Sequence, residues 1–240
     1  MTLLQMLSFG ENGWGMALLQ AALMTLALTL AALLIGALVG SVIAAAKLSR
    51  HRPWRALGEA YSILFRGIPE LLVIYLFYFG GASMVSAVHH WLGGEGYVDV
   101  PPFLVGAIAV GLISGSYQAE VYRGAFLAVA KGELEAALAI GMRRSLRIRR
   151  VLIPQIWRYA LPGLGNVWQM SLKDSALISV IGLVELMRAS QVAAGSTRQY
   201  FTFYIVGGLC YLLLTGLSGR LFNFAEGRVQ RTQRRNPAQP

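Results

Sequence analysis

The sequence predicts an all-helical (all-α) integral membrane protein with about five transmembrane helices. Of its 240 residues, 56% are hydrophobic and only 13% are charged, whereas about 25% of residues are charged in an average soluble domain. A soluble fold of this size needs a polar surface and could not bury so many apolar side chains. A disordered chain would be far less hydrophobic. Five stretches are long and apolar enough to cross a bilayer, which takes roughly 20 mostly apolar residues.

We expect these spans at residues 16–46, 67–88, 103–120, 161–184 and 201–219. The first carries no charge and is longer than a span requires, so it should either be tilted or begin in the membrane interface. The second should follow a short amphipathic helix that contains Arg66, with a kink at Pro69. The third ends at Glu120, and the fourth is apolar apart from Lys173 and Asp174 in its middle.

Basic residues predict the orientation of the chain. Of the 21 Lys and Arg residues, all but Lys173, Arg188 and Arg198 fall on one side of such a five-span arrangement. Because cytoplasmic loops retain Lys and Arg, we predict an outer N-terminus and a cytoplasmic C-terminus. The net charge of +10 would suggest a nucleic-acid partner in a soluble protein, but no segment resembles a nucleic-acid-binding module. We expect the basic C-terminal tail to lie near anionic membrane lipid.

Small residues inside the spans predict close helix packing. Gly36 and Gly40 form a GxxxG pattern in the first span, and Gly111 and Gly115 form another in the third. Such spacing lets two helices approach closely. No metal site is expected, because the three histidines lie in predicted loops without a third ligand nearby, and the chain has one cysteine.

The long cytoplasmic loop, at about residues 123–158, should contain two short helices. The first carries Glu133 and Glu135 in its first turn, where negative charge suits the helix dipole, and it should end at Gly141. The second should cover residues 142–153 and be closed by Pro154. From the residues alone, this loop either docks on a soluble partner or lies on the lipid headgroups as an ordinary positive-inside loop.

The same loop resembles the EAA signature of ABC importer permeases. In that signature E-A-A is followed after three residues by G, and after nine more by I-x-L-P. The matching residues here are Glu135, Ala136, Ala137, Gly141 and Pro154, with Val in place of the first Ile and Ile in place of the Leu. Three further segments resemble the polar amino acid subfamily of these permeases: Arg66-Gly67-Ile68-Pro69, Glu120-Val121-Tyr122-Arg123-Gly124 and Lys173-Asp174-Ser175-Ala176-Leu177.

This resemblance implies the fold of a type I ABC importer permease, with residues 1–240 as one transmembrane permease domain in a bacterial cytoplasmic (inner) membrane. It implies import of polar amino acids, basic ones or opines in particular, because the segment 159–169 is most similar to the histidine, basic amino acid and opine branch. The coupling helix that contacts the ATPase would contain Glu133, Glu135, Ala136, Ala137, Gly141 and Arg143.

The implied partners are two ATP-binding subunits, a second permease subunit (paralogous or identical) and an outer, periplasmic solute-binding protein. ATP and Mg²⁺ would belong to the ATP-binding subunits. The chain has no Gly-x4-Gly-Lys-Ser/Thr sequence with which to cradle ATP phosphates. We therefore expect neither a cofactor nor enzymatic activity in the chain itself.

Charged residues at membrane depth are costly and mark either a substrate path or a structural ion pair. The candidates for the substrate path are Glu70, Glu120, Lys173, Asp174 and Ser175. Lys173 and Asp174 are adjacent and point in different directions on a helix, so at least one of them needs another partner. The available partners are Glu120, Glu70 and Arg66. Glu120 and Arg123 are three residues apart and can pair as a structural anchor. The residues expected to serve as structural motifs are Arg66, Gly67, Pro69, Arg123 and Pro154.

Two other classes of function are compatible with the composition. A membrane-embedded enzyme would need a reactive constellation at membrane depth, and the few intramembrane carboxylates and the loop histidines do not supply one. A non-transporting structural subunit of a membrane complex would have the same composition but would not explain the EAA spacing.

Overall fold

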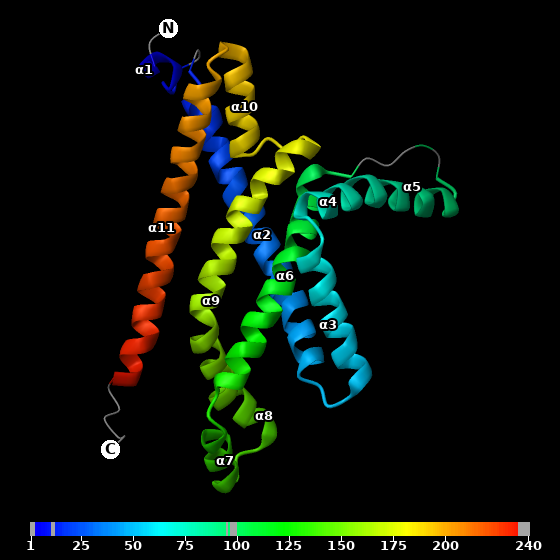
Figure 1. The fold of residues 1–240 in the computed structure, drawn as a ribbon, viewed down its shortest axis with the longest axis vertical. Coiled ribbons are helices and arrows are strands. Elements are labelled where there is room, and N and C mark those ends of the chain that lie inside the picture. The colour runs from blue at the N-terminus through cyan, green and yellow to red at the C-terminus, as the bar shows by residue number, and fades with distance from the viewer. Residues whose placement is uncertain (1–2, 11–12, 95, 97–99, 235–240) are drawn as a thin grey trace.

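The computed structural model describes residues 3–10, 13–94, 96 and 100–234, which are helical almost throughout. The long helices are α2 (Gly15–Lys47), α6 (Pro102–Ala128), α9 (Ile153–Asp174) and α11 (Tyr200–Arg234). All four run broadly along the long axis of the molecule (Figure 1). The short N-terminal helix α1 (Leu3–Met6) and the end of α11 lie at opposite ends of this axis. This arrangement agrees with an odd number of spans.

The described residues contain four helical stretches that are long and apolar enough to cross a membrane: Gly15–Lys47, Glu70–Trp91, Pro102–Ala128 and Tyr200–Val229. A fifth candidate is the bent pair Arg144–Ile181 and Leu186–Thr197, whose two parts meet at 51°. The prediction of an all-helical membrane protein with about five spans is therefore confirmed.

The second span begins later than predicted and leaves the direction of the others. The amphipathic helix α3 (Arg52–Gly67) lies beside α2, and the extended backbone of Ile68 and Pro69 separates it from the span. Proline disfavours helical backbone in the residue before it, so the helix ends there and a new one starts at Glu70. The span consists of α4 (Glu70–Tyr75), the π-helical turn η1 (Leu76–Gly80) and α5 (Gly81–Trp91). It extends across the long axis (Figure 1).

The third and fifth spans are longer than predicted. Helix α6 continues past Glu120 to Ala128, and α11 continues past residue 219 to Arg234. The predicted ends followed the first charged residue, but a charge need not end a helix when it finds a partner or water. Residues 231–234 of the basic tail are helical, and residues 235–240 lie outside the described part of the chain.

The prediction that Pro154 closes a separate helix over residues 142–153 is wrong. The structure has α7 (Lys131–Ala139), then α8 (Arg144–Arg147), which runs through the π-helical turn η2 (Ile148–Leu152) directly into α9. Pro154 lies in the first turn of α9. Proline has no N–H to donate to the preceding turn, and a local π turn shifts the hydrogen-bond register at this point. The fourth span thus starts well before residue 161.

The fourth span also ends differently from the prediction. Helix α9 ends at Asp174, and the chain continues as the 3₁₀ helix η3 (Ser175–Ile181). Gly182 then adopts a φ of +96°, which only glycine reaches without strain, and this stops the helix. Lys173 and Asp174 consequently lie at a helix terminus rather than in the middle of a regular span.

The core is formed where α2 crosses α6. The GxxxG patterns pack closely, as predicted, and the structure places the two patterns against each other. A Cβ atom on Gly36 would lie 2.2 Å from the Ser114 Oγ and 3.1 Å from the Gly111 carbonyl oxygen, and one on Gly40 would lie 2.9 Å from the Gly115 carbonyl oxygen. Only glycine lets the two backbones approach this closely.

A buried carboxylate organises the end of the molecule near α1. Glu185 is fully buried and precedes α10 (Leu186–Thr197). It accepts hydrogen bonds from the backbone N–H groups of Met187 (2.8 Å) and Arg188 (2.7 Å) and from the Tyr211 hydroxyl (2.8 Å). The side chain therefore caps α10 and joins it to α11.

Candidate functional site

The segment with the EAA spacing forms the tip of the molecule at the end opposite α1. Helix α7 projects there together with α8 (Figure 1). Leu138 and Ile140 are 60% and 78% exposed, and Glu135 and Ala136 are exposed beside them. An acidic and apolar surface of this kind has no partner within the described chain and is suited to a groove on another protein.

Gly141 ends α7, as predicted. Its φ is +77°, in the left-handed region. Its N–H donates to the Leu138 carbonyl at 2.9 Å, and the next N–H, that of Met142, donates to the Ala137 carbonyl at 3.1 Å. This is a C-terminal cap of the type that requires glycine, because a Cβ atom would strain the backbone. Arg143 follows in the turn before α8 and is exposed.

Two residues of the predicted coupling set hold the segment to the body of the chain. Ala137 is only 6% exposed, so it packs inward rather than contributing to the exposed face of α7. Glu133 accepts a hydrogen bond from the Gln155 amide in the first turn of α9. This hydrogen bond connects the tip to the fourth span.

A cluster of charges joins α2, α3 and α6. The Lys47 side chain is 2% exposed and its Nζ forms ion pairs with Glu120 and, at 3.1 Å, with Glu59. Glu120 also pairs with the Nε of Arg123 at 2.9 Å, as the spacing predicts, and with Arg66 at 3.9 Å. Three cations thus surround the Glu120 carboxylate, and these ion pairs link α2, α3 and α6.

The sequence did not single out Lys47 or Glu59. The charge pattern places Lys47 only among the basic residues of the cytoplasmic side, whereas the structure buries it at the end of α2. The one local signal is that Lys47 follows 31 residues without a charge, Met16–Ala46. Its partner Glu120 is 73 residues away, and only the fold brings the two together.

A second cluster lies next to the first and contains three of the predicted substrate-path residues. Glu70 opens α4 and Asp174 ends α9, and their carboxyl groups lie near each other. Lys173 is exposed beside them. Tyr117 of α6 is near both carboxyl groups, and the Arg66 guanidinium lies 5.4 Å from the centre of its ring.

Arg66 and Tyr117 also line a cleft of about 390 Å³, together with Lys47, Glu59 and Glu120. Carboxylates and cations thus both lie on the surface of this cleft, and Tyr117 also belongs to the second cluster. Ser175 does not reach this surface: it is fully buried, and its hydroxyl donates to the Leu172 carbonyl at 2.7 Å. Tyr117 is the member of the cluster that sequence reasoning missed, since a tyrosine in an apolar helix carries no distinctive pattern.

Comparison with known proteins decides the family. Residues 32–231 match the family described as "Binding-protein-dependent transport system inner membrane component". The chain belongs to this family of transport permeases. The permease is 52% identical over 232 residues to the octopine transport system permease protein OccQ of Rhizobium meliloti, covering 97% of this chain and 98% of that protein.

The permease is also 40% identical to the histidine/lysine/arginine/ornithine transport system permease protein HisQ of Escherichia coli, covering 90% of this chain and 94% of that one. Its fold is similar to a crystal structure of an amino acid ABC transporter with histidines, at a TM-score of 0.75 and 33% identity over 90% of this chain and 95% of the other. The predicted ABC permease fold is therefore confirmed, and the permease is a multi-pass membrane protein.

Proposed function

We propose that the permease is the membrane subunit of an ATP-driven importer for opines and basic amino acids. The observation that carries the substrate class is similarity along nearly the whole chain, 52% to an octopine permease and 40% to a histidine/lysine/arginine/ornithine permease. We place it in a bacterial inner membrane, together with two ATP-binding subunits, a second permease subunit and an outer solute-binding protein. ATP and Mg²⁺ belong to the ATP-binding subunits.

The paired carboxyl groups of Glu70 and Asp174 are suited to a cationic substrate. A guanidinium or ammonium group between them would supply the positive charge that two adjacent carboxylates lack. Arg66 and Lys173 stand nearby and could receive the substrate's own carboxylate. In this arrangement the substrate binds beside the helix breaks at Pro69 and Asp174, where irregular backbone lines the path.

Coupling follows from how α7 is attached. A rigid-body movement of an ATP-binding subunit docked on α7 would pass to α9 through the contact between Glu133 and Gln155. Asp174 lies at the far end of α9. One continuous helix thus connects the ATPase surface to the substrate cluster, and alternating access would move both together.

Substitution of the helix-ending glycine tests this coupling. Gly141→Asp places a side chain at a φ of +77° and should leave the complex assembled but reduce ATP-driven arginine uptake in proteoliposomes by about tenfold or more. The matched control is Gly132→Asp, which lies in the first turn of the same helix with open space around it. Equal uptake by wild type and Gly141→Asp would remove the coupling role.

Substitution of Glu70 tests the substrate cluster. Glu70→Gln removes one of the two facing carboxylates and should raise the KM for arginine and lysine by about tenfold, since a charged hydrogen bond is worth about 1.5–3 kcal/mol. Transport of a neutral amino acid by the same variant is the internal control, and ATP hydrolysis should persist. Unaltered transport of arginine and lysine would exclude Glu70 from the site.

Neither of the two alternative functions, a non-transporting structural subunit or a membrane-embedded enzyme, is favoured. A structural subunit that does not transport would neither move substrate nor respond to the binding protein, whereas the proposed importer hydrolyses ATP faster when the loaded binding protein is added. A membrane enzyme would turn over its substrate without ATP-binding subunits. Measuring uptake and ATP hydrolysis with and without each partner separates all three.

A further inference from the structure

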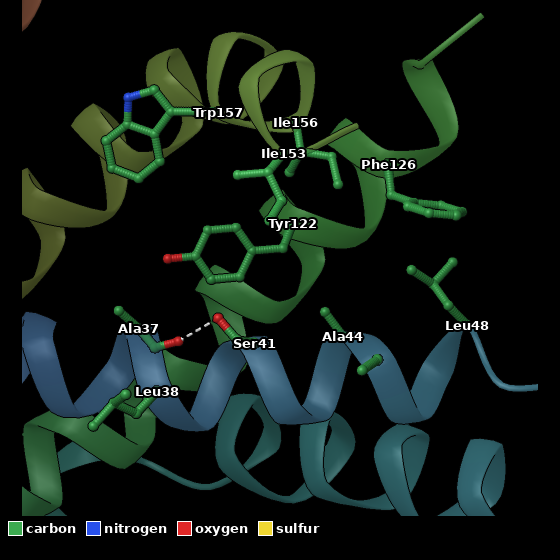
Figure 2. Close-up of a pocket in the computed structure, with 11 residues that line it drawn as sticks. Ala37, Leu38, Ser41, Ala44, Leu48, Tyr122, Phe126, Ile153, Ile156 and Trp157 are labelled. Atoms are coloured by element: carbon green, nitrogen blue, oxygen red, sulfur yellow. Dashed lines mark hydrogen bonds between the residues drawn. The ribbon is translucent and has the colours of Figure 1, made fainter. Parts of the chain in front are cut away.

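An apolar groove lies between the halves of α2, α6 and α9 that are nearest to the tip formed by α7 and α8 (the coupling tip). Its volume is about 660 Å³, which is within the usual range for ligand sites. Figure 2 shows the side chains that face it from the three helices. The residues that matter here are Leu38, Ser41 and Ala45 of α2, Tyr122 of α6, and Ile156 and Trp157 of α9.

The two hydroxyl groups that line the groove are already hydrogen-bonded within the chain. The Ser41 hydroxyl donates to the Ala37 carbonyl at 2.6 Å, and the Tyr122 hydroxyl donates to the Gln118 amide oxygen at 2.9 Å (Figure 2 shows the first of these bonds). A polar ligand would therefore gain little in the groove and would lose its hydration. The groove suits a flexible hydrocarbon chain.

The groove is open along its side at the depth of the membrane. Leu38 is 74% exposed and Trp157 is 54% exposed, although both lie on helices that belong to spans. In a bilayer we expect lipid acyl chains to reach this exposed side of the groove. A chain entering from the bilayer would need no gate.

Arginines stand at the cytoplasmic end of the groove. Arg149 and Arg150 precede Ile153 by about one turn, and Ile153 lines the groove. Both arginines are exposed. In the connection between α2 and α3, Arg50 is exposed and follows the lining residue Leu48 by two positions. Basic residues beside a pocket between spans on the cytoplasmic side are the pattern that recognises anionic headgroups.

We propose that this groove is a binding site for one acyl chain of an anionic phospholipid, whose phosphate is held by Arg149 and Arg150. The apolar lining accepts the chain, and the arginines select the headgroup. The site is separate from the substrate cluster, which lies on the other side of α2 and α6. A lipid held here would contact α9 between the coupling tip and the substrate cluster.

Native mass spectrometry of the assembled transporter tests the proposal. The delipidated complex is mixed with phosphatidylglycerol or with phosphatidylcholine of the same acyl chains. The wild type should retain phosphatidylglycerol in preference, at one lipid per copy of this chain. Ala45→Phe fills the groove from an exposed position and should abolish that retained lipid. The control is Leu23→Phe, which is 59% exposed in the other half of α2.

The charges are tested separately. Arg149→Gln with Arg150→Gln should lower retention of phosphatidylglycerol by about tenfold and leave phosphatidylcholine unchanged. The control also removes two positive charges, with Arg188→Gln and Arg198→Gln, but at the end of the molecule near α1. Equal lipid retention by wild type and Ala45→Phe, or equal loss in Ala45→Phe and Leu23→Phe, overturns the proposal.

A different occupant of the groove, the second permease subunit, is tested in the same complex. Ser41→Cys is introduced together with Cys210→Ser, and thiol cross-linking to the other subunits is measured. If the proposal holds, the cysteine at this position remains free of cross-links and reacts with a maleimide only after lipid is removed. A cross-link to the second permease subunit would make the groove a protein interface and would overturn the lipid site.

Discussion

Lys47 is a single side chain that holds three helices together. It ends α2, pairs with Glu59 of α3 and Glu120 of α6, and donates to the Ser62 hydroxyl at 3.2 Å. Gly58 of α3 makes room for it, since a Cβ atom there would lie 2.6 Å from the Lys47 Cγ. A buried charge is tolerated only with such a set of partners.

Removing this charge should destabilise the permease. Lys47→Met keeps the length of the side chain but leaves Glu120 with less compensation, and we expect a loss of about 2 kcal/mol in the free energy of unfolding. Glu59 is 53% exposed and adds little to this figure. Unfolding by denaturant in detergent micelles measures the change.

The double variant Lys47→Met with Glu120→Gln is the internal control for that experiment. It removes both charges of the pair, so part of the lost stability should return. Lys131→Met, at an exposed lysine on α7, should change stability by less than about 0.5 kcal/mol. The single variant Glu120→Gln is measured as well. If the stability losses of Lys47→Met and Glu120→Gln simply add up in the double variant, the ion-pair interpretation is contradicted.

Local pairs could be predicted from the sequence, and distant ones could not. Glu120 and Arg123 are one helical turn apart, so their contact follows from spacing alone. The contacts of Lys47 with Glu120, and of Glu70 with Asp174, depend on how α2, α4, α6 and α9 are placed in space. Nothing in a single sequence states which of several charges will meet.

At the scale of elements, glycine spacing determines which helices pack most closely. The GxxxG pairs of α2 and α6 lie against each other, so the two backbones are in contact along more than one turn. Helices in a bilayer gain little from the hydrophobic effect when they associate, and close van der Waals packing takes its place. Loss of the small residue should therefore weaken the whole crossing.

Gly36→Val tests the crossing of α2 and α6. The new side chain would collide with Ser114 and with the backbone of α6, and we expect a loss of about 3 kcal/mol because a packed core accommodates extra methyl groups poorly. Gly208→Val is the matched control, since Gly208 lies in α11 with nothing within 4 Å of its Cβ direction. Similar loss of stability in both variants, measured by thermal unfolding in detergent, would show that helix propensity rather than packing is responsible.

Element types were easier to predict from the sequence than element ends. Apolar runs located all five spans, because hydrophobic length is a direct requirement of the bilayer. Predictions of helix ends were wrong where a residue that often ends a helix is accommodated by the surrounding structure, so that the helix continues. Pro154 is accommodated by the π turn η2, and Glu120 is neutralised by its cations, so neither ends its helix.

At the scale of the whole molecule, charge and shape agree on one orientation. The arginines of α8 and η2 lie at the coupling tip, and α11 ends toward the same end of the long axis (Figure 1). Helix α10, by contrast, lies near α1 at the other end. The positive-inside rule then places the tip in the cytoplasm and α10 outside, which is also what docking of an ATP-binding subunit on α7 requires.

Cysteine labelling in whole cells tests this orientation. In a Cys210→Ser background, Ser196→Cys places a thiol at an exposed position of α10, and Ser145→Cys places one at an exposed position of α8. The reagent is one that passes a permeabilised outer membrane but does not cross the inner membrane. It should label only Ser196→Cys in intact cells, and both variants after the inner membrane is opened. If Ser145→Cys is labelled before the inner membrane is opened, and Ser196→Cys is not, the topology is the reverse of the predicted one. An inverted topology would put α7 on the outer side and make contact with an ATPase impossible, so the coupling proposal depends on this result.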